Sequence, residues 1–501
     1  MKKMKLIFTI ILLFSLCGCE LSFSSTTTNK QDRGKSILSI IEMNDVHGFI
    51  EQNSSNKLGL SNMAYLINEV REEQDYDNVL LLGNGDMFQG TALSKMSYGR
   101  VLIDCMNVMD FDACTIGNHE FDWGLDVILD YFDGNIENGE ANFPLLNANV
   151  YYNNSLLTID NGNIFESYTY DKANVKVGVI GYIGDVKSSI NKVYVEGYDF
   201  DLEIAESVKK IGSKLKSEGA DIIVVAIHDG ATNEYYSVNR ELSALRYNGK
   251  FLVDAIINGH THTKQAYVIA RPDNPGLPVI QSNGYQNNYL YTAGRIDLTI
   301  DLEEKKVSKV GLSHIQVSSA GANYDQGVEA IIDSYYNMSK DELEEEYCYN
   351  EISSSKNSTE LRKWVSNVML AATGADIAIC NTGGLRTNLP EGILTIAELY
   401  AINPFDNVIV IHECDASLIN EFIDSSYYFY SVKGSLKTSG TYKVAVIDYV
   451  FNSDYYNKCR TSSYVNSKII LRDALISDLR LRESINVYDN NEAVLSQIYN
   501  G

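Results

Sequence analysis

The stretch TIGNHEFDWG, residues 115–124, crowds polar side chains directly behind a short apolar run. An amide (Asn118), an imidazole (His119) and two carboxylates (Glu120 and Asp122) follow one another closely. The β-branched residues before them are typical of a strand, and the flanking glycines are typical of turns. This stretch therefore predicts a strand that ends in a loop carrying chemically active groups.

Four other stretches show the same order, with an apolar run followed by Asp or His. They read IIEMNDVHG (40–48), LLLGNGDMFQG (80–90), IIVVAIHDG (222–230) and IINGHTHT (256–263). Helical patterns alternate with such runs; between Leu202 and Leu215, for example, apolar residues recur at helical intervals. Strands that alternate with helices predict βα units around buried sheets, and hence an α/β fold.

The polar residues at these strand ends are expected to meet. Residues at the carboxyl end of a parallel strand face the crevice where α/β proteins bind ligands. A lone histidine after a strand can be a structural group, but a buried cluster of carboxylates and imidazoles without compensating charge is costly. Two divalent cations, such as zinc or manganese, would remove that cost. The expected ligands are Asp45, His47, Asp86, Asn118, His228, His260 and His262.

The order of these motifs resembles that of the calcineurin-like metallophosphoesterases. NDVHG, GDMFQG, GNHEFD and GHTH are similar, more closely, to the bacterial 5′-nucleotidase / UDP-sugar hydrolase family. The resemblance implies a four-layer α/β/β/α sandwich over residues 36–324 and a smaller α/β nucleotide-binding domain over 351–501. A charged helical linker is expected between them, over 325–350. One ion would take Asp45, His47 and His262, the other Asn118, His228 and His260, and Asp86 would bridge them.

His119 and Asp122 are the expected catalytic pair. His119 follows a ligand by one residue, so its ring should face the substrate rather than the same ion. Asp122 lies three residues further on and can accept a hydrogen bond from the ring, which would fix the tautomer. The family uses this pair to stabilise the phosphoryl transition state and assist the leaving group, while a hydroxide formed between the two ions attacks phosphorus. Asp122 could also cap the helix expected after it.

The second domain carries the expected nucleoside site. CNTGGLRT (380–387) and NPFDN (403–407) are similar to the family's substrate-binding segments. The resemblance implies that Arg386 binds a phosphate or carboxylate, that Asn381 bonds a base edge, and that Phe405 stacks on the base. Gly383 and Gly384 would let the backbone approach the ligand. Taken alone, the glycines could be a turn and Phe405 a core residue.

The other side of the expected base site is less regular. In IDYVFNSDYYN (447–457), Tyr449 and Asp454 match the family best, and Phe451 is the alternative to Tyr449. The family's paired glycines are missing from this loop, so the base preference stays open. The arginine that the family has early in this domain corresponds only to Arg362, in a shifted position.

The N-terminus predicts export and a lipid anchor. MKKMK supplies positive charge, and the apolar run 6–16 is too short for a comfortable membrane span, so residues 1–18 read as a signal peptide. LCGC (16–19) resembles the bacterial lipobox, with Cys19 as the acylated residue and 19–35 as a flexible tether. Plain signal cleavage is the alternative. We expect an extracytoplasmic, membrane-anchored protein whose other cysteines are buried free thiols.

The composition limits the partners. The chain has 501 residues and a formal net charge of −25, which disfavours binding to nucleic-acid polymers and to anionic lipid. Small phosphate substrates remain compatible, because bound divalent ions reverse the local field. We expect a 5′-nucleotidase-type phosphohydrolase that acts on a nucleotide or nucleotide sugar, with hinge rotation between its domains. The alternatives are a 2′,3′-cyclic nucleotide phosphodiesterase/3′-nucleotidase, a UDP-sugar hydrolase, or a non-catalytic surface binding protein on the same scaffold. Oligomeric state is not predicted.

Overall fold

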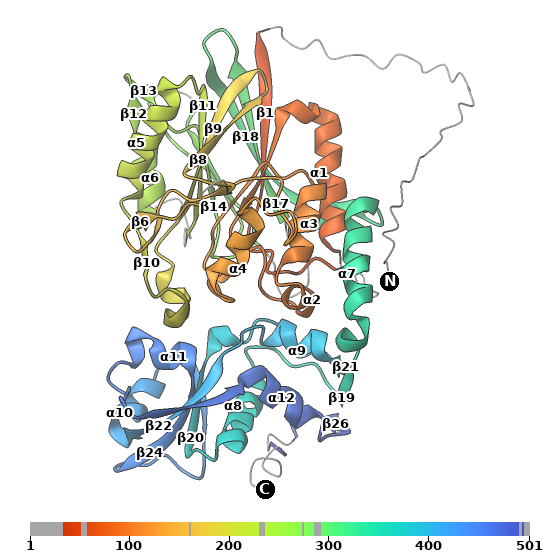
Figure 1. Ribbon diagram of the computed structural model, residues 1–501, viewed down its shortest axis with the longest axis vertical. Helices are drawn as coiled ribbons and strands as arrows, with labels where there is room; N and C mark the ends of the chain where they lie inside the picture. The colour runs from red at the N-terminus through yellow and green to blue at the C-terminus, as the bar shows by residue number, and fades with distance from the viewer. Residues whose placement is uncertain are drawn as a thin grey trace, which may run out of the picture.

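The computed structural model describes residues 34–51, 58–159, 162–229, 236–272, 275–284, 292–489 and 493–494. It shows two α/β domains, one above the other along the long axis, with helix α7 (Gln326–Leu343) beside both (Figure 1). The expected signal peptide, Cys19 and almost all of the tether lie outside the described residues. Among the described residues, no helix is both long and apolar enough to cross a membrane.

The first domain contains two large sheets. The first has the order β18-β17-β1-β2-β3-β4-β7. Its strands are β1 (Lys35–Met43), β2 (Val79–Asn84), β3 (Ala113–Thr115), β4 (Leu145–Leu146), β7 (Ile164–Phe165), β17 (Thr292–Asp301) and β18 (Lys306–Gln316). Strands β1, β2, β3, β4 and β7 run parallel, so their carboxyl ends share one edge. Strands β17 and β18 form an antiparallel hairpin at the opposite edge of the sheet.

The second sheet has the order β15-β16-β14-β11-β9-β8. Its strands are β8 (Ser167–Lys172), β9 (Val175–Ile183), β11 (Ile222–His228), β14 (Ala255–Asn258), β15 (Gln265–Ile269) and β16 (Leu277–Gln281). Strands β9, β11, β14 and β16 are parallel. The central strands of both sheets are buried along their length, which explains why they read as continuous apolar runs.

The two sheets pack face to face, and helices cover their outer faces (Figure 1). Side chains alternate along a strand. Ile40 and Leu80 therefore join the core between the sheets, whereas Ile41 and Leu81 join the core under the outer helices. The first sheet's helices are α1 (Leu60–Gln74), α2 (Ala92–Met96), α3 (Arg100–Val108), α4 (Leu125–Leu129) and α7; the second sheet's are α5 (Ile204–Ser217) and α6 (Ser237–Ala244). The predicted four-layer sandwich is confirmed.

The second domain is built on a five-stranded sheet with the order β23-β20-β24-β22-β25. These strands are β20 (Ile377–Asn381), β22 (Val408–Asp415), β23 (Tyr428–Val432), β24 (Thr441–Ile447) and β25 (Tyr464–Ile470). Its helices are α8 (Thr359–Thr373), α9 (Ile396–Ile402), α10 (Ala416–Ile423), α11 (Asp448–Asn452) and α12 (Leu471–Leu479). A small sheet of β19 (Glu346–Asn350), β21 (Gly392–Thr395) and β26 (Ser484–Ile485) lies beside α7 and α12 (Figure 1).

Two local expectations differ from the structure. The helical linker expected over 325–350 is helical only to Leu343, because residues 346–350 pair with β21 and β26 and bury Tyr347 and Cys348. Tyr449 follows the apolar run 444–447, which is typical of a strand, but it lies in α11. Strand β24 ends at Ile447, where the Asp448 carboxylate accepts the N–H of Tyr449 at 2.8 Å and the chain turns into a helix.

Candidate active site

Five strand ends bring the seven predicted metal ligands together. They are the ends of β1 (Asp45, His47), β2 (Asp86), β3 (Asn118), β11 (His228) and β14 (His260, His262). All of these side chains except those of His260 and His262 are buried. Their donor atoms form groups close enough to hold a metal ion, and two of these groups are Asp45–His47–His262 and Asp86–His228–His260. The sheet topology therefore creates the cluster that the motifs predicted.

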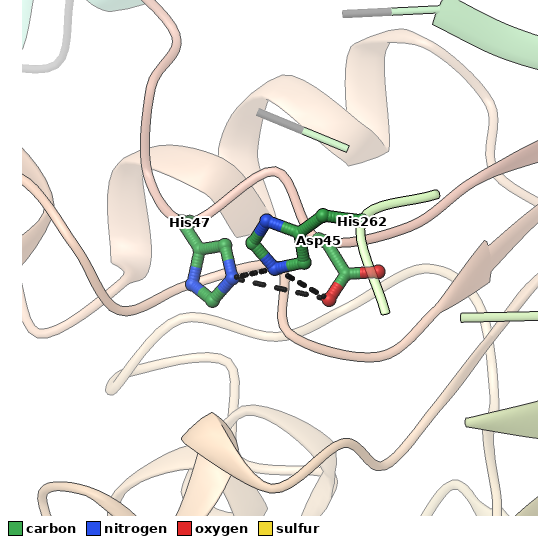
Figure 2. Close-up of side chains that lie close together, drawn as sticks. All are labelled: Asp45, His47 and His262. Atoms are coloured by element: carbon green, nitrogen blue, oxygen red, sulfur yellow. Dashed lines mark hydrogen bonds and ion pairs between the residues drawn. The ribbon is translucent and has the colours of Figure 1, made fainter. Parts of the chain in front are cut away.

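Figure 2 shows the first group. The Nε2 atoms of His47 and His262 are 3.1 Å apart, and His262 Nε2 is 3.1 Å from Asp45 Oδ1. His47 Nδ1 lies 3.1 Å from the carbonyl oxygen of Gln89, which requires a proton on Nδ1. In a neutral His47, Nε2 therefore carries the lone pair that would bind an ion.

The second group repeats this arrangement. His228 Nδ1 lies 2.7 Å from the carbonyl oxygen of Asn84, so Nε2 of the neutral ring carries the lone pair. That lone pair faces Asn118 Oδ1 and Asp86 Oδ2, each at 3.2 Å. Asn118 Oδ1 is also 2.7 Å from His260 Nδ1.

This chemistry fits a cation. A buried imidazole lone pair, an amide oxygen and a carboxylate oxygen that face one another repel unless a positive charge lies between them. Carboxylate, imidazole and amide donors together suit borderline divalent metals. Asp86 belongs to more than one group, because Oδ2 faces His228 at 3.2 Å and His47 at 4.0 Å. Its position between the groups is the one expected for a bridging carboxylate.

The backbone is strained at the same positions. Five candidate ligands, none of them glycine, have positive φ: Asp45, His47, Asp86, His260 and His262, with φ from 51° to 72°. Left-handed backbone costs free energy for such residues and is retained where the surrounding structure enforces it. Here it turns successive side chains of each loop, such as Asp45 and His47, toward the same site.

The predicted dyad is formed. His119 Nδ1 lies 2.8 Å from Asp122 Oδ2, and the His119 backbone N–H donates to Asp86 Oδ1 at 2.7 Å. Burial lowers the pKa of His119, but the carboxylates of Asp122 and Asp86 outweigh it and raise that pKa above its usual value. The Nε2 atom is left to face the cavity. The alternative role of Asp122 is not realised, because α4 begins at Leu125 with Gly124 as its cap.

Three residues support the site in ways that the sequence analysis did not specify. Glu120 is buried and accepts the backbone N–H groups of Gly117, Asp86 and Met87, so it fixes the loop that carries Asp86. Gln89 orients His47 through its carbonyl, and the Asn84 carbonyl orients His228. Their positions inside the motifs were a signal, but backbone contacts cannot be read from residue type.

A cavity of about 200 Å³ adjoins the dyad and is lined by both domains. The first domain contributes His119, Asp122, Trp123, Asn191 and Tyr194 among others. The second contributes the predicted residues Asn381, Gly383, Gly384, Arg386, Phe405 and Tyr449. The Phe405 ring centroid is 5.7 Å from that of His119, and the Arg386 guanidinium is 3.2 Å from His47 Nε2. Six of the seven predicted substrate residues therefore line one cavity.

The seventh, Asp454, is misplaced by the sequence prediction. Its side chain is 74% exposed and pairs with Lys192 at 2.5 Å, because the shortened loop folds into a short helix on the surface. Phe451, the alternative to Tyr449, is buried against His412 and Tyr464. Arg362 lines a second cavity with Lys356 and Arg386, next to His47 and His262.

The six described cysteines are buried free thiols, as expected.

The sequence matches two family models. Residues 38–264 match the calcineurin-like phosphoesterases, and residues 338–432 match the 5′-nucleotidase C-terminal domain. The first match contains the seven candidate ligands and the dyad. The second contains Asn381, Arg386 and Phe405 but ends before Tyr449. The resemblance read from the motifs is confirmed.

Individual proteins agree with this result. The chain is 24% identical over 461 residues to a 5′-nucleotidase of Vibrio cholerae, with 84% of the chain and 80% of that protein covered. It is 27% identical over 458 residues to the trifunctional nucleotide phosphoesterase protein YfkN of Bacillus subtilis, where 78% of the chain matches only 30% of the relative. The crystal structure of a 5′-nucleotidase precursor from Thermus thermophilus has a TM-score of 0.73 at 20% identity, covering 90% of this chain and 99% of that one, which shows the shared fold.

Proposed function

The chain belongs to the metal-dependent phosphoesterases that join a calcineurin-like phosphoesterase domain to a 5′-nucleotidase C-terminal domain, and we propose that it is a 5′-nucleotidase. It would cleave phosphate from a nucleoside 5′-monophosphate. One observation carries this proposal: the dyad, Arg386 and the aromatic residues Phe405 and Tyr449 line a single cavity beside the candidate ligands. If the phosphate of a nucleotide binds at the candidate metal ligands, its nucleoside could therefore lie between Phe405 and Tyr449.

The metal-binding, cationic and aromatic side chains of the site have separate roles in the proposed reaction. Asp45, His47 and His262 would hold one divalent ion, Asn118, His228 and His260 a second, and Asp86 both. When bound, such ions supply Lewis acidity toward the phosphoryl oxygens and an activated water nucleophile. Arg386 adds positive charge where negative charge develops on the phosphoryl group. Phe405 and Tyr449 flank the base and exclude water from the reacting end.

His119 would protonate the leaving group. Asp122 holds its Nδ1 proton, so the proton on Nε2 of the charged ring can pass to the ester oxygen as the bond between phosphorus and that oxygen breaks. The products are a nucleoside with a free hydroxyl group and inorganic phosphate. The raised pKa of His119 favours the charged ring that this step needs.

A second activity is favoured by the second cavity. Its volume is about 540 Å³, it is lined by Lys356, Arg362 and Arg386, and it adjoins His47, His260 and His262. A further anionic group, such as the sugar phosphate of a nucleotide sugar, could occupy it while the nucleoside lies against Phe405. We therefore propose pyrophosphate-bond hydrolysis of nucleotide sugars as the second candidate activity.

The location is a separate proposal that rests on the N-terminal sequence alone. A short apolar segment that ends in LCGC supports export and acylation of Cys19. A single acyl chain anchors weakly, so stable attachment would need more than one. Replacing Cys19 with Ser should move the protein from the membrane fraction to the medium or soluble fraction, and an unchanged distribution would exclude the anchor.

A panel of substrates tests the activity. Loss of substrate and formation of products would be measured by chromatography with AMP, UDP-glucose and 2′,3′-cyclic AMP, and as nitrophenolate release with bis-p-nitrophenyl phosphate, in each case with manganese or zinc and with EDTA. The proposal expects AMP to be the best substrate and EDTA to abolish turnover. If 2′,3′-cyclic AMP or UDP-glucose is preferred, the corresponding alternative replaces it. Absence of turnover on all four, with metal bound, would favour a binding protein.

The substitution His119→Ala separates catalysis from binding. It removes the proton donor but none of the ligands in the two proposed ion sites, so kcat for AMP should fall by about 10²- to 10⁴-fold. The metal content per chain, measured by elemental analysis, should stay at the wild-type value. Unchanged turnover would rule out the dyad.

A further inference from the structure

The Phe405 loop, residues 403–407, lies between the two domains and forms one wall of the nucleotide cavity. Pro404, Phe405, Asp406 and Asn407 all line that cavity. The Phe405 ring is 5.7 Å from the His119 ring, so the wall faces the catalytic group directly. Any contact that fixes this loop relative to the first domain also fixes the distance between the base and the dyad.

Arg472 holds the loop within its own domain. Its guanidinium pairs with Asp406 Oδ1 at 2.5 Å, donates to the carbonyls of Asn403 and Phe405 at 3.3 Å, and stacks on Tyr400 at 3.6 Å. Arg472 is only 2% exposed. These bonds shape the loop, but they do not depend on the first domain.

Lys95 joins this loop to the first domain through an ion pair. It lies in α2 of the first domain, and its Nζ is 2.6 Å from Asp406 Oδ2. The two side chains are 17% and 26% exposed, so salt screens this pair less than it screens exposed pairs. Lys95 Nζ also lies 4.8 Å from the Tyr98 ring and 5.5 Å from the ring of Trp123, another cavity residue. Its position is therefore fixed on the first-domain side as well.

A second contact acts beside it. Gln89 Nε2 donates to the carbonyl of Pro404 at 3.1 Å, while the Gln89 carbonyl orients His47. The loop is therefore joined to the metal-ligand region at Pro404 and to α2 at Asp406. Of the two joints, only the Lys95–Asp406 joint can be removed without disturbing a residue that contacts a candidate ligand.

We propose that Lys95 is a positioning residue of the nucleotide cavity: through Asp406 it holds the Phe405 loop against the first domain, so that Phe405 lies beside His119. This inference rests on the proposed function, because it concerns how the nucleoside is placed. Lys95 does not line the cavity and is assigned no contact with substrate. Its effect should therefore appear only with substrates that carry a base.

The test compares Lys95→Met with matched variants. Methionine keeps the apolar stem but removes the charge, and Lys95→Arg restores it. Lys192→Met is the control, because Lys192 and Asp454 form another ion pair between the domains. The side chains of that pair are more exposed, 44% for Lys192 and 74% for Asp454. Each variant would be assayed with AMP and with ribose 5-phosphate, which has the same phosphate group but no base.

Lys95→Met should lower kcat/KM for AMP about tenfold, the effect of removing a close, partly buried charge pair, and should change that for ribose 5-phosphate less than twofold. Lys95→Arg should recover most of the loss, and Lys192→Met should behave as wild type. In an Asp406→Asn background, Lys95→Met should add little. Equal losses on both substrates without rescue by arginine, or no loss on AMP, would overturn the proposal.

Amide hydrogen exchange decides the point even if no nucleotide is hydrolysed. Peptides that cover 403–407 should exchange several-fold faster in Lys95→Met than in wild type or Lys192→Met, because the loop would lose its contact with the first domain. Faster exchange with no nucleotide turnover in the wild type would refute the proposed function but not the role of Lys95. Unchanged exchange would refute the role of Lys95 itself.

Discussion

At the scale of single residues, the site depends on pairs in which one group orients another. His47 and His228 are oriented by carbonyl oxygens, the loop of Asp86 by Glu120, and His119 by Asp122. The motifs were sufficient to predict that these side chains would meet, because each candidate ligand lies at or shortly after the end of a strand. The specific contacts of Glu120 and Gln89 could not be predicted, because they involve backbone groups that only the folded loops bring near.

The substitution Asp122→Asn tests the pair in which a carboxylate orients an imidazole. An amide can keep the hydrogen bond to His119 Nδ1 but carries no negative charge, so the charged ring is less stable during the reaction. We expect kcat for AMP to fall about 10²-fold while the metal content stays constant. Asp126→Asn, a change at an exposed carboxylate in the following helix, should leave kcat unchanged. Loss of metal from Asp122→Asn would instead assign Asp122 to the ion site.

At the scale of elements, the sequence predicted the buried strands well and the second domain's edges poorly. Strands such as β2 and β11 are buried throughout, so their apolar runs are unambiguous. By contrast, residues 346–350 are acidic and aromatic and become a strand only by pairing with β21 and β26, which are distant in sequence. Tyr449 follows an apolar run that reads as strand, but the Asp448 carboxylate stops the strand there.

Asp448 also gives α11 a measurable pH dependence. Burial raises the pKa of Asp448 to about 6, although the hydrogen bond that its carboxylate accepts from the Tyr449 N–H has the opposite effect. The folded protein thus binds this proton more tightly than the unfolded chain, so the stability that it contributes is present below about pH 4 and is lost as pH rises to about 6. We expect Asp448→Asn to raise the free energy of unfolding by roughly 2 kcal/mol at pH 7 and hardly at all at pH 4.

Chemical denaturation at both pH values measures this effect. Asp415→Asn is the contrasting variant, because hydrogen bonds from Ser417 lower the pKa of Asp415, which is exposed and caps α10. Asp415→Asn should therefore show no increase in the free energy of unfolding at pH 7. Equal stability of Asp448→Asn and wild type at pH 7 would show that the Asp448 carboxylate is as well solvated in the folded protein as in the unfolded chain.

At the scale of the whole molecule, the candidate site lies where the two domains meet. The family resemblance implied a catalytic domain and a nucleoside domain, but not which side chains would face each other across the boundary. Trp123 was given no role within its motif, Tyr194 and Lys95 lie outside the motifs, and Asp454 was placed in the cavity by analogy with a longer loop. These contacts depend on how the two domains are placed relative to each other, and no short stretch of the sequence indicates that placement. The fold of each domain was therefore easier to predict than the cavity between them.

The metal cluster should stabilise the first domain as a unit. Its ligands come from five strand ends in two sheets, so ions bound there connect both halves of the sandwich and bind only the folded state. An ion present at about 100 times its dissociation constant adds about 2.7 kcal/mol, and two such ions should raise the melting temperature by roughly 10 °C. Scanning calorimetry of chelated protein, before and after manganese or zinc is added, would measure this shift.

Variants locate the effect. His262→Ala removes a candidate ligand and should lose at least half of the metal-dependent increase, whereas His314→Gln, a change at a histidine outside the candidate ligand groups, should keep it. Among the described residues, the candidate ligand groups all lie in the first domain, so a separate transition of the second domain should not move. If chelation leaves the melting curve of the wild type unchanged, the strand ends do not hold ions and the hydrolytic mechanism has no nucleophile.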